Sequence, residues 1–429
     1  MSTKQSCVIA VVLALWACPL RAAVVNSRWI GPDEGEWGNP YNWSPAIVPD
    51  NRPGQTFRVT IDARSFTGDE LEVTLRENRT IDRLDVYGNV QLQRRVQVDL
   101  EQMVLAIEED LDMTLTVTSP GNGLTNHGAF CSEVIIQGDV VNEAGACLRK
   151  GGLDIVGGSL RNAANARIEG GGVMETHDGD ILNHGVTVCQ GPVSGLWAAH
   201  GLQNHGLIQV YGGRCGSDET VTNEKLGIIK GFGAVDSPQL ISNAGLIQSL
   251  GGALILRSLP EFWQEPSTNP RFANTGTVTN SPGTTITVIV SMEDSTNNGT
   301  LMVNAAGSIV FDCNLVNEPN AVVGLLGGTL AAKTITQKAG ATLQGFGGIT
   351  SDVVIEPKGV VRLTGPTNIV GDVTIGQDAT LDVSDGTVLI TGLTTCNGGT
   401  IRTKNGTVIT QGGLSGGICR REFVSPVGP

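Results

Sequence analysis

Aromatic and charged residues are both scarce in this sequence. Aromatic side chains make up 4% of the 429 residues and charged ones 16%, where an ordinary soluble domain carries about 25% charged residues. Lys and Arg number 28 against 42 Asp and Glu, a net charge of −14. This balance excludes a nucleic-acid partner. Hydrophobic residues make up 40% of the chain, which excludes a disordered polymer.

Long apolar runs are also missing. No stretch approaches the ~18 residues of a transmembrane helix, so we expect no membrane span. Residues 1–22 combine Lys4, a short apolar stretch and small residues at a cleavage site, and we interpret them as a signal peptide. Cys18 leaves a lipoprotein anchor as a minor alternative. The mature protein is therefore expected to be secreted or to lie at the cell surface, with residues 420–429 as a C-terminal tail.

Cysteines occur in an odd number after the signal peptide. The nine cysteines less Cys7 and Cys18 leave seven, so at least one thiol is free or pairs with another chain. The pairs closest in sequence, Cys131 with Cys147 and Cys396 with Cys419, are the candidate disulfides in an exported protein. No Cys-x-x-Cys motif occurs, so we predict structural or free thiols and no metal site.

Glycine is the residue in excess, with 58 copies. A turn recurs about every 20 residues, in which Asn precedes Gly and a β-branched or aliphatic run follows, as in residues 181–188. Where Gly is missing, Asn or Asp replaces it, so we predict a left-handed backbone at this position of each repeat. The turn positions are Gly128, Gly145, Asn165, Gly185, Gly206, Gly227, Gly245, Gly276, Gly299, Asn320, Gly340, Gly359, Asp378 and Gly399.

Repeats of this length cannot bury an apolar face alone, so successive repeats must stack. We predict an all-β fold, a right-handed parallel β-helix of about 14 coils of about 20 residues over 121–419. Stacking would place the asparagines above one another as a hydrogen-bonded ladder. We predict that residues 63–120 form irregular first β coils. Residues 23–62, with Trp29, Trp37, Tyr41 and Trp43, are expected to cap the first coil with aromatic side chains.

The Asn-x-Gly turn repeats resemble those of secreted bacterial β-helix proteins of the autotransporter-passenger and filamentous-haemagglutinin type. The resemblance covers residues 120–419, and the Trp-rich stretch from Trp29 to Pro49 is similar to the opening of many bacterial exported proteins with such repeats. It does not include the C-terminal translocator that defines an autotransporter. The family implies export, a solenoid fold, and an adhesive or scaffolding role at the cell surface.

One local cluster of ionisable residues is a candidate for chemistry. Glu175, His177, Asp178 and Asp180 lie within six residues of one another, and polysaccharide lyases and glycoside hydrolases of the pectate-lyase-like β-helix type use carboxylates and a base on such a rod. An ordinary turn before the next strand explains the same residues. His127, His184 and His205 each lie between the Asn and the Gly of a turn, where stacked imidazoles would reach a shared metal ion, but a tolerated polar position is the interpretation we adopt.

The last candidates are a calcium site and two loops that could recognise a ligand. The acidic residues Glu108, Glu109, Asp110 and Asp112 suggest calcium, but no calcium-loop motif occurs and a solvated acidic face is favoured, so we predict no cofactor. Two predicted loops carry Trp197 and the pair Phe262 and Trp263, which are the candidate contacts to a carbohydrate or protein, with packing onto the rod as the alternative.

The sequence therefore favours an exported structural, adhesive or binding protein without catalysis. An enzyme that cuts an acidic polysaccharide is the alternative.

Overall fold

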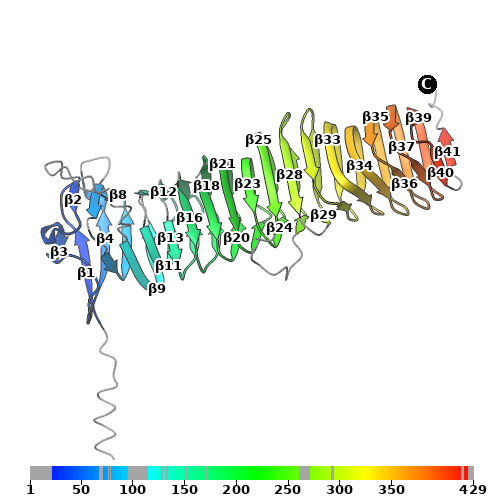
Figure 1. The fold of residues 1–429 in the computed structure, drawn as a ribbon. Coiled ribbons are helices and arrows are strands. Elements are labelled where there is room, and N and C mark those ends of the chain that lie inside the picture. Colours follow the sequence, from blue (N-terminus) through cyan, green and yellow to red (C-terminus); the bar gives the residue numbers. More distant parts are fainter. Residues whose placement is uncertain are drawn as a thin grey trace, which may run out of the picture.

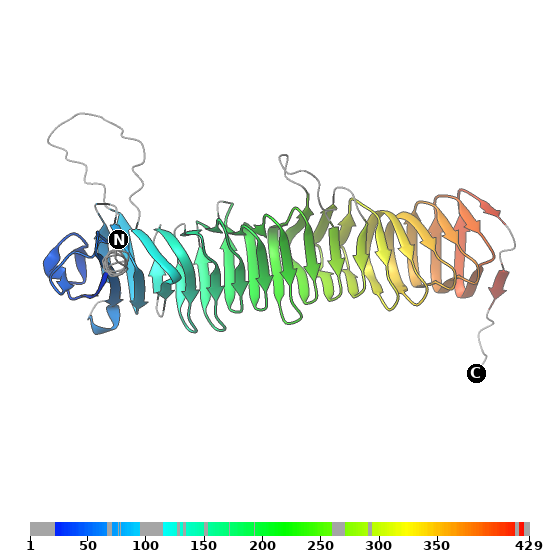
Figure 2. The same ribbon diagram turned by 90° about the horizontal axis from the view of Figure 1, so that it is seen from below.

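The computed structural model describes residues 22–66, 71–75, 77, 79–94, 115–126, 129–131, 134–149, 153–170, 172–192, 194–259, 271–290, 294–416 and 420–423. The chain winds into a long rod of stacked coils that runs from the N-terminal to the C-terminal strands (Figures 1 and 2). Apart from the pairing of β1 with β3, each named strand pairs with its neighbour in the adjoining coil in parallel. The predicted parallel β-helix of about 14 coils is confirmed.

Each coil contributes strand segments to three lateral faces. Face 1 follows the Asn-Gly turn and includes β8 (Asn89–Arg94), β10 (Ala129–Cys131), β12 (Cys147–Arg149), β15 (Arg167–Gly170), β18 (Val186–Gln190), β27 (Thr277–Asn280), β30 (Thr300–Asn304) and β41 (Arg420–Phe423). Face 2 includes β6 (Arg79–Ile81), β13 (Leu153–Val156), β16 (Val173–Thr176), β19 (Gly195–Ala198), β28 (Thr285–Val290) and β31 (Ser308–Phe311).

Face 3 precedes the turn. It includes β7 (Arg83–Tyr87), β14 (Leu160–Asn162), β17 (Ile181–Asn183), β20 (Gly201–Asn204), β22 (Thr220–Asn223), β24 (Leu240–Asn243), β26 (Arg271–Asn274), β29 (Ser295–Asn297), β32 (Leu315–Asn317), β36 (Val373–Ile375), β38 (Thr394–Cys396) and β40 (Leu414–Gly416). Longer strands bend from one face to the next: β9 (Leu115–Asn126), β11 (Val134–Asn142), β21 (Leu207–Ser217), β23 (Ile228–Asp236), β25 (Leu246–Ser258), β33 (Val322–Gln337), β34 (Thr342–Ile355), β35 (Val360–Val370), β37 (Thr380–Ile390) and β39 (Thr400–Thr410).

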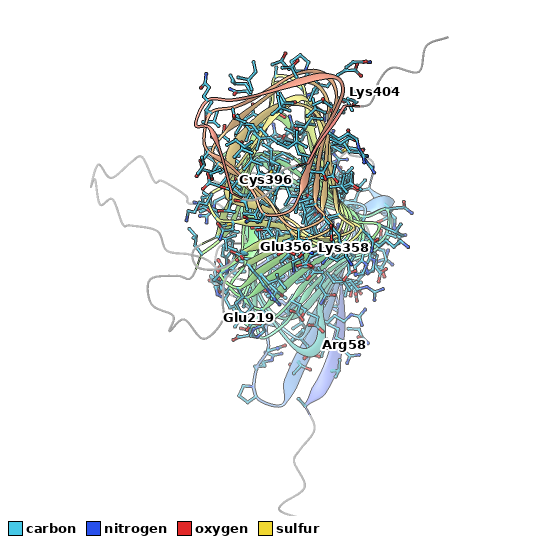
Figure 3. The ribbon with its side chains drawn as sticks, turned by 90° about the vertical axis from the view of Figure 1, so that its right-hand side faces the viewer. Arg58, Glu219, Glu356, Lys358, Cys396 and Lys404 are labelled. Carbon is cyan, nitrogen blue, oxygen red and sulfur yellow. The ribbon has the colours of Figure 1, made fainter. Side chains whose placement is uncertain are left out.

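The core fills the inside of the rod with stacks of aliphatic side chains. In β28 every second residue is buried, so Ile286, Val288 and Val290 point inward and the residues between them point outward. The parallel register then places like residues above one another, as in the buried column from Leu160 through Ile181 and Leu202. In the view along the axis, Cys396 lies inside the coils and Lys404 outside (Figure 3). Each fully buried Leu or Ile contributes about 1.5–3 kcal/mol of burial free energy.

A ladder of buried amides runs along face 3, as the sequence predicted. Each amide donates through its side-chain nitrogen to the side-chain oxygen of the next member, at 2.7–3.0 Å. After its last member the same register position holds Ile355, Ile375 and Cys396. The ladder consists of Asn126, Asn142, Asn162, Asn183, Asn204, Asn223, Asn243, Asn274, Asn297, Asn317 and Gln337.

The turns correct the prediction of one left-handed residue in each coil. Positive φ occurs at some predicted positions, such as Gly145 (82°) and Asn165 (64°), and in two later turns it falls one residue earlier, at Lys358 and Gly398. At Gly206 the backbone φ is not positive. A Cβ there would lie 2.2 Å from the carbonyl oxygen of Gly185 in the preceding coil, so close backbone stacking is what requires glycine.

The N-terminal strands carry a buried tryptophan cluster. β1 (Ala23–Trp29), β2 (Glu34–Glu36), β3 (Trp43–Ser44), β4 (Gln55–Asp62) and β5 (Leu71–Leu75) build this end, with short 3₁₀ turns at η1 (Pro40–Asn42) and η2 (Ala63–Ser65). Trp29 and Trp37 each pack edge-on against Trp43, with ring centroids 5.0 and 4.7 Å apart. Tyr41 was expected in this cap, but its side chain is 81% exposed because it lies on η1 and points to solvent.

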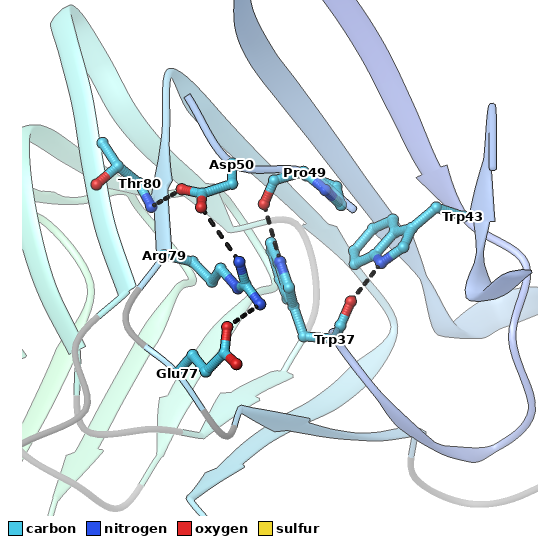
Figure 4. A network of polar contacts seen from close by, with 7 residues as sticks. All are labelled: Trp37, Trp43, Pro49, Asp50, Glu77, Arg79 and Thr80. Atoms are coloured by element: carbon cyan, nitrogen blue, oxygen red, sulfur yellow. Dashed lines mark hydrogen bonds and ion pairs between the residues drawn. The ribbon is translucent and has the colours of Figure 1, made fainter. Parts of the chain in front are cut away.

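Hydrogen bonds tie the tryptophan cluster to the first coils (Figure 4). The indole nitrogen of Trp37 donates to the carbonyl of Pro49 at 3.0 Å, and that of Trp43 donates to the carbonyl of Trp37 at 2.8 Å. Asp50, next to Pro49, accepts from the backbone N–H of Thr80 at 3.0 Å and from the guanidinium of Arg79 at 3.2 Å. The cap is therefore fixed to the following coil through Asp50.

Of the two predicted disulfides, one is wrong and the other stays a prediction. Cys396 is disulfide-bonded, and its predicted partner Cys419 lies outside the described residues. Cys147 carries a free thiol, so the predicted bridge to Cys131 is wrong. The register pairs Cys147 with Ala129 and places Cys131 opposite Arg149. Two residues along a strand and one strand spacing across separate the two cysteine Cα atoms by about 8 Å, beyond the ~7 Å limit of a disulfide.

Residues 1–22 of the predicted signal peptide, including Cys18, lie outside the described residues except for Ala22. The acidic residues Glu108, Glu109, Asp110 and Asp112 also lie outside them. Within the described part of the chain no helix is long and apolar enough to cross a membrane.

Candidate binding face

The polar residues of greatest interest lie on the outward side of face 2. Glu175 in β16 is in register with Asp154 in β13 on one side and with Trp197 in β19 on the other. The same column continues through Gly216 and Asp236 to Arg257. We call the surface from Asp154 to Arg257, together with His177, Arg214 and Asp218, the Trp197 face. Its members recur 19 to 22 residues apart along the column because one coil separates each from the next.

Two of the four candidate catalytic residues meet at the start of this column. One ligand atom each from Asp154, Glu175 and His177 lies within 4.8 Å of the others. His177 directly follows β16, two residues after Glu175, so the extended backbone sends both side chains to the same side. The N–H of His177 donates to the carbonyl of Ile155 at 2.8 Å. Asp154 was not among the predicted site residues; its position 21 residues before Glu175, one coil earlier, is the signal that could have identified it.

The other two candidates are not part of this group. Asp178 is exposed on the turn that follows β16. Asp180 lies at the start of face 3, where its Oδ1 accepts from the backbone N–H of Gly201 in the next coil at 2.8 Å. Asp139 makes the same contact with the N–H of Ser159 at 2.9 Å. Both lie along a depression of about 420 Å³ over β11, β14, β17 and β20. The Asp180 carboxylate is thus engaged in coil stacking, and no catalytic group of four forms.

Trp197 is half-buried and lies across the next coil. A Cβ on Gly216 would come within 2.7 Å of the indole ring, so the ring occupies the space that a side chain at 216 would fill. The indole N–H donates to the Oδ1 of Asp218 at 2.6 Å. The guanidinium carbon of Arg214 lies 5.5 Å from the ring centroid, within cation–π range. The ring is therefore fixed on the rod, and part of it stays accessible.

Two arginines and one carboxylate form a fixed group beside this ring. Asp236 is buried and accepts from Arg214 Nε at 2.9 Å and from Arg257 Nε at 2.6 Å. Arg257 adds a second bond from Nη2 at 3.2 Å. The side chains of Arg214 and Arg257 remain 56% and 37% exposed. Because one buried carboxylate orients both guanidinium groups, their remaining N–H groups face solvent in a defined geometry.

The stacked turn histidines are real but lie elsewhere. The rings of His184 and His205 are 4.6 Å apart and nearly parallel, at 17°. They occupy the turns between face 3 and face 1, away from the Trp197 face. Burial, the neighbouring His205 and Arg161 hold the pKa of His184 below its usual value. His127 lies outside the described residues.

Two buried thiols near this face are poor nucleophiles. Burial raises the pKa of the Cys189 thiol to about 12, and burial also raises that of Cys215, so neither ionises readily to a nucleophile. Phe262 and Trp263, the other candidate contacts, lie outside the described residues. Of the three aromatic contact candidates, Trp197 alone is described.

No protein-family model, curated protein or solved structure matches this chain.

Proposed function

We propose that this chain is an exported, non-catalytic binding protein that holds a carbohydrate on the Trp197 face at the cell surface. The observation that carries the proposal is the half-buried indole of Trp197, fixed across Gly216 and bordered by oriented carboxylate and guanidinium groups. Export rests on the sequence pattern of residues 1–22 and on the family resemblance of the turn repeats.

A sugar matches this surface better than a protein segment does. A pyranose ring has an apolar face that packs on an aromatic ring and a rim of hydroxyls that needs donors and acceptors in fixed directions. Arg214 and Arg257 supply donors, and Glu175 and Asp218 supply acceptors, on either side of Trp197. Because Glu175, Arg214 and Arg257 lie on strands paired on both sides, and the N–H of Asp218 is bonded to the carbonyl of Ala198 in the preceding coil, little ordering free energy is lost on binding.

Retention on immobilised polysaccharides tests the proposal. Wild-type protein is passed over a panel of neutral and acidic polysaccharides, and W197A and W197F are passed over those that retain it. We expect W197A to lose retention at least tenfold and W197F to keep an intermediate level, because Phe restores an aromatic face without the indole N–H. Y41A serves as the matched control, since Tyr41 is an exposed aromatic at the far N-terminal cap. Retention of W197A equal to wild type contradicts the proposal, as does a partner found only among proteins.

A polysaccharide lyase or glycoside hydrolase is the second candidate, and the group of Asp154, Glu175 and His177 favours it. One carboxylate oxygen each from Asp154 and Glu175 lies within 4.8 Å of the other, shorter than the ~6.5–9.5 Å between the carboxyl groups of an inverting hydrolase and nearer the ~5–5.5 Å of a retaining one. Acidic polysaccharides incubated with the protein are assayed for new unsaturated or reducing ends. Cleavage that H177A abolishes would replace the non-catalytic proposal with this one.

A further inference from the structure

We propose that Asp154, Glu175 and His177 bind one divalent transition-metal ion of the zinc class on the Trp197 face. The ligand atoms of these three side chains lie within 4.8 Å of one another. The point equidistant from the corners of a triangle with 4.8 Å sides lies about 2.8 Å from each corner. Zinc–oxygen and zinc–nitrogen bonds are about 2.0–2.2 Å long. Each ligand atom therefore needs to move inward by less than about 1 Å, which a side-chain rotation provides.

The backbone beneath the three side chains is already in place. Asp154 and Glu175 are register partners on adjacent parallel strands, β13 and β16. His177 directly follows β16, and its N–H is bonded to the carbonyl of Ile155 in the preceding coil. The ligands therefore come from two coils that the main-chain ladder holds together, and binding an ion needs side-chain rotation only.

Charge separates this group from the rest of its column. Carboxylates directly opposite each other on neighbouring strands repel, and in the described part of the chain neither Asp154 nor Glu175 forms an ion pair with Lys or Arg. Four coils after Asp154 along the same column, the carboxylate of Asp236 is neutralised internally by Arg214 and Arg257. A divalent cation between Asp154 and Glu175 neutralises the pair that lacks such a partner, and His177 supplies a neutral third ligand.

The donor set selects the class of metal. Calcium and magnesium take oxygen ligands almost exclusively, whereas an imidazole nitrogen beside carboxylates suits zinc and its neighbours in the transition series. Three protein ligands leave at least one position for water or a ligand. Trp197 is the register neighbour of Glu175 on the side away from Asp154, so the ion would lie within about two coils of the indole. A bound ion would add a contact for a sugar hydroxyl or carboxylate, a role that rests on the proposed function, while ion binding itself does not.

Calorimetric titration of the chelator-treated full chain with ZnCl₂ tests this site without any carbohydrate. We expect one zinc ion per chain, with binding weakened at least tenfold in each of D154N, E175Q and H177A and not displaced by a hundredfold excess of Ca²⁺. Loss of binding in H177A, which leaves both carboxylates in place, separates coordination from general attraction to an acidic surface. Circular dichroism of each variant checks that the β fold is intact.

Two control variants test whether zinc binds at another histidine instead of His177. H200A removes an imidazole that lies 3.2 Å from Glu219 and outside the group, and H184A removes one member of the stacked pair; both should bind zinc as wild type does. Zinc binding lost in H184A but kept in H177A overturns the proposal, and so does the absence of zinc binding by wild-type protein. Zinc binding with no retention on any polysaccharide leaves the metal site standing and refutes the carbohydrate proposal.

Discussion

Two regions of this rod solve the same structural problem differently. From Asn126 to Gln337 the position before the turn on face 3 holds a buried amide that bonds to the amides above and below it. From Ile355 onward the same position holds Ile355, Ile375 and Cys396, and the face 3 strands continue to pair without a register shift. The fold therefore does not need the amide at this position. What it needs is a neighbour of the same kind, because a buried amide without a partner costs more than an apolar side chain.

The ends of the ladder show where that rule is strained. Gln337 accepts from Asn317 at 3.0 Å, but its own Nε2 has no hydrogen-bond partner where the register passes to Ile355. A buried donor left unpaired costs about 1–3 kcal/mol. The junction between the two regions is thus the weakest point of the amide column.

The largest effect is expected from breaking the ladder in its middle. In N204L one of the two Nδ2 N–H groups of Asn183 loses its acceptor while the other keeps the carbonyl of Leu207, and the Oδ1 of Asn223 loses its donor. Two buried groups left unpaired cost about 2–5 kcal/mol of unfolding free energy, measured by urea denaturation. The matched change in the other region, I375L, keeps an apolar neighbour on both sides and should cost less than about 1.5 kcal/mol. Equal costs for the two variants contradict the comparison.

A second change moves the boundary between the regions. I355N places an amide next to Gln337, where its oxygen can accept from the unpaired Nε2. I375N places an amide between Ile355 and Cys396, with no amide on either side. We expect I355N to be more stable than I375N by about 1–3 kcal/mol, the cost of one orphaned donor. Urea denaturation of both variants measures the difference, and a more stable I375N sinks the account of the junction.

A smaller effect separates the two kinds of turn glycine. Gly206 stacks against the carbonyl of Gly185 without positive φ, whereas Gly145 has a φ of 82° and nothing within 4 Å of its missing Cβ. Asn tolerates a left-handed backbone better than Ala does. We therefore expect G145N to cost less than G145A, by a few tenths of a kcal/mol to about 1 kcal/mol. G206N should cost at least as much as G206A. Thermal denaturation of the four variants checks the order, and the same Asn preference at both sites would show one kind of turn.

The smallest effect is a pH dependence confined to the ladder region. Burial is the first cause that lowers the pKa of His184 in the folded protein, followed by the nearby His205 and Arg161. The unfolded chain then binds a proton more readily than the folded one, so stability present above pH ~6.5 declines as the pH falls through that value. Hydrogen exchange should show faster opening of residues 181–208 at pH 5 than at pH 7, after correction for intrinsic rates, relative to residues 353–376. H184A should abolish the difference.

The repeat made most of the fold predictable from the sequence, whereas the remaining features depend on the strand register. Asn followed by Gly at intervals of about 20 residues was enough to predict coils and a ladder, because each coil must repeat the contacts of its neighbour. It did not reveal why Gly206 is glycine, since φ and backbone stacking favour the same residue. The predicted pairing of Cys131 with Cys147 relied on their nearness in sequence. The strand register instead pairs Cys147 with Ala129, two residues before Cys131.

Only some residues of the Trp197 face could be predicted from the sequence, because the strand register brings the others to it. Glu175, His177 and Trp197 drew attention as local features, but Asp154, Arg214 and Asp236 are single charged residues in separate coils. Their alignment depends on insertions in each coil, which vary the spacing between 19 and 22 residues along this column. Asp178 and Asp180 were close in sequence to Glu175, yet the corner after β16 turns Asp180 onto face 3.

Binding at Trp197 is the claim on which the functional account depends, and a direct titration tests it best. The polysaccharide that retains wild-type protein most strongly is cleaved to soluble oligosaccharides, and their affinities for wild type, W197A and Y41A are measured by calorimetry. The account predicts an affinity at least tenfold lower for W197A and unchanged for Y41A. Equal affinities for wild type and W197A, with both proteins folded, would place the binding surface elsewhere on the rod.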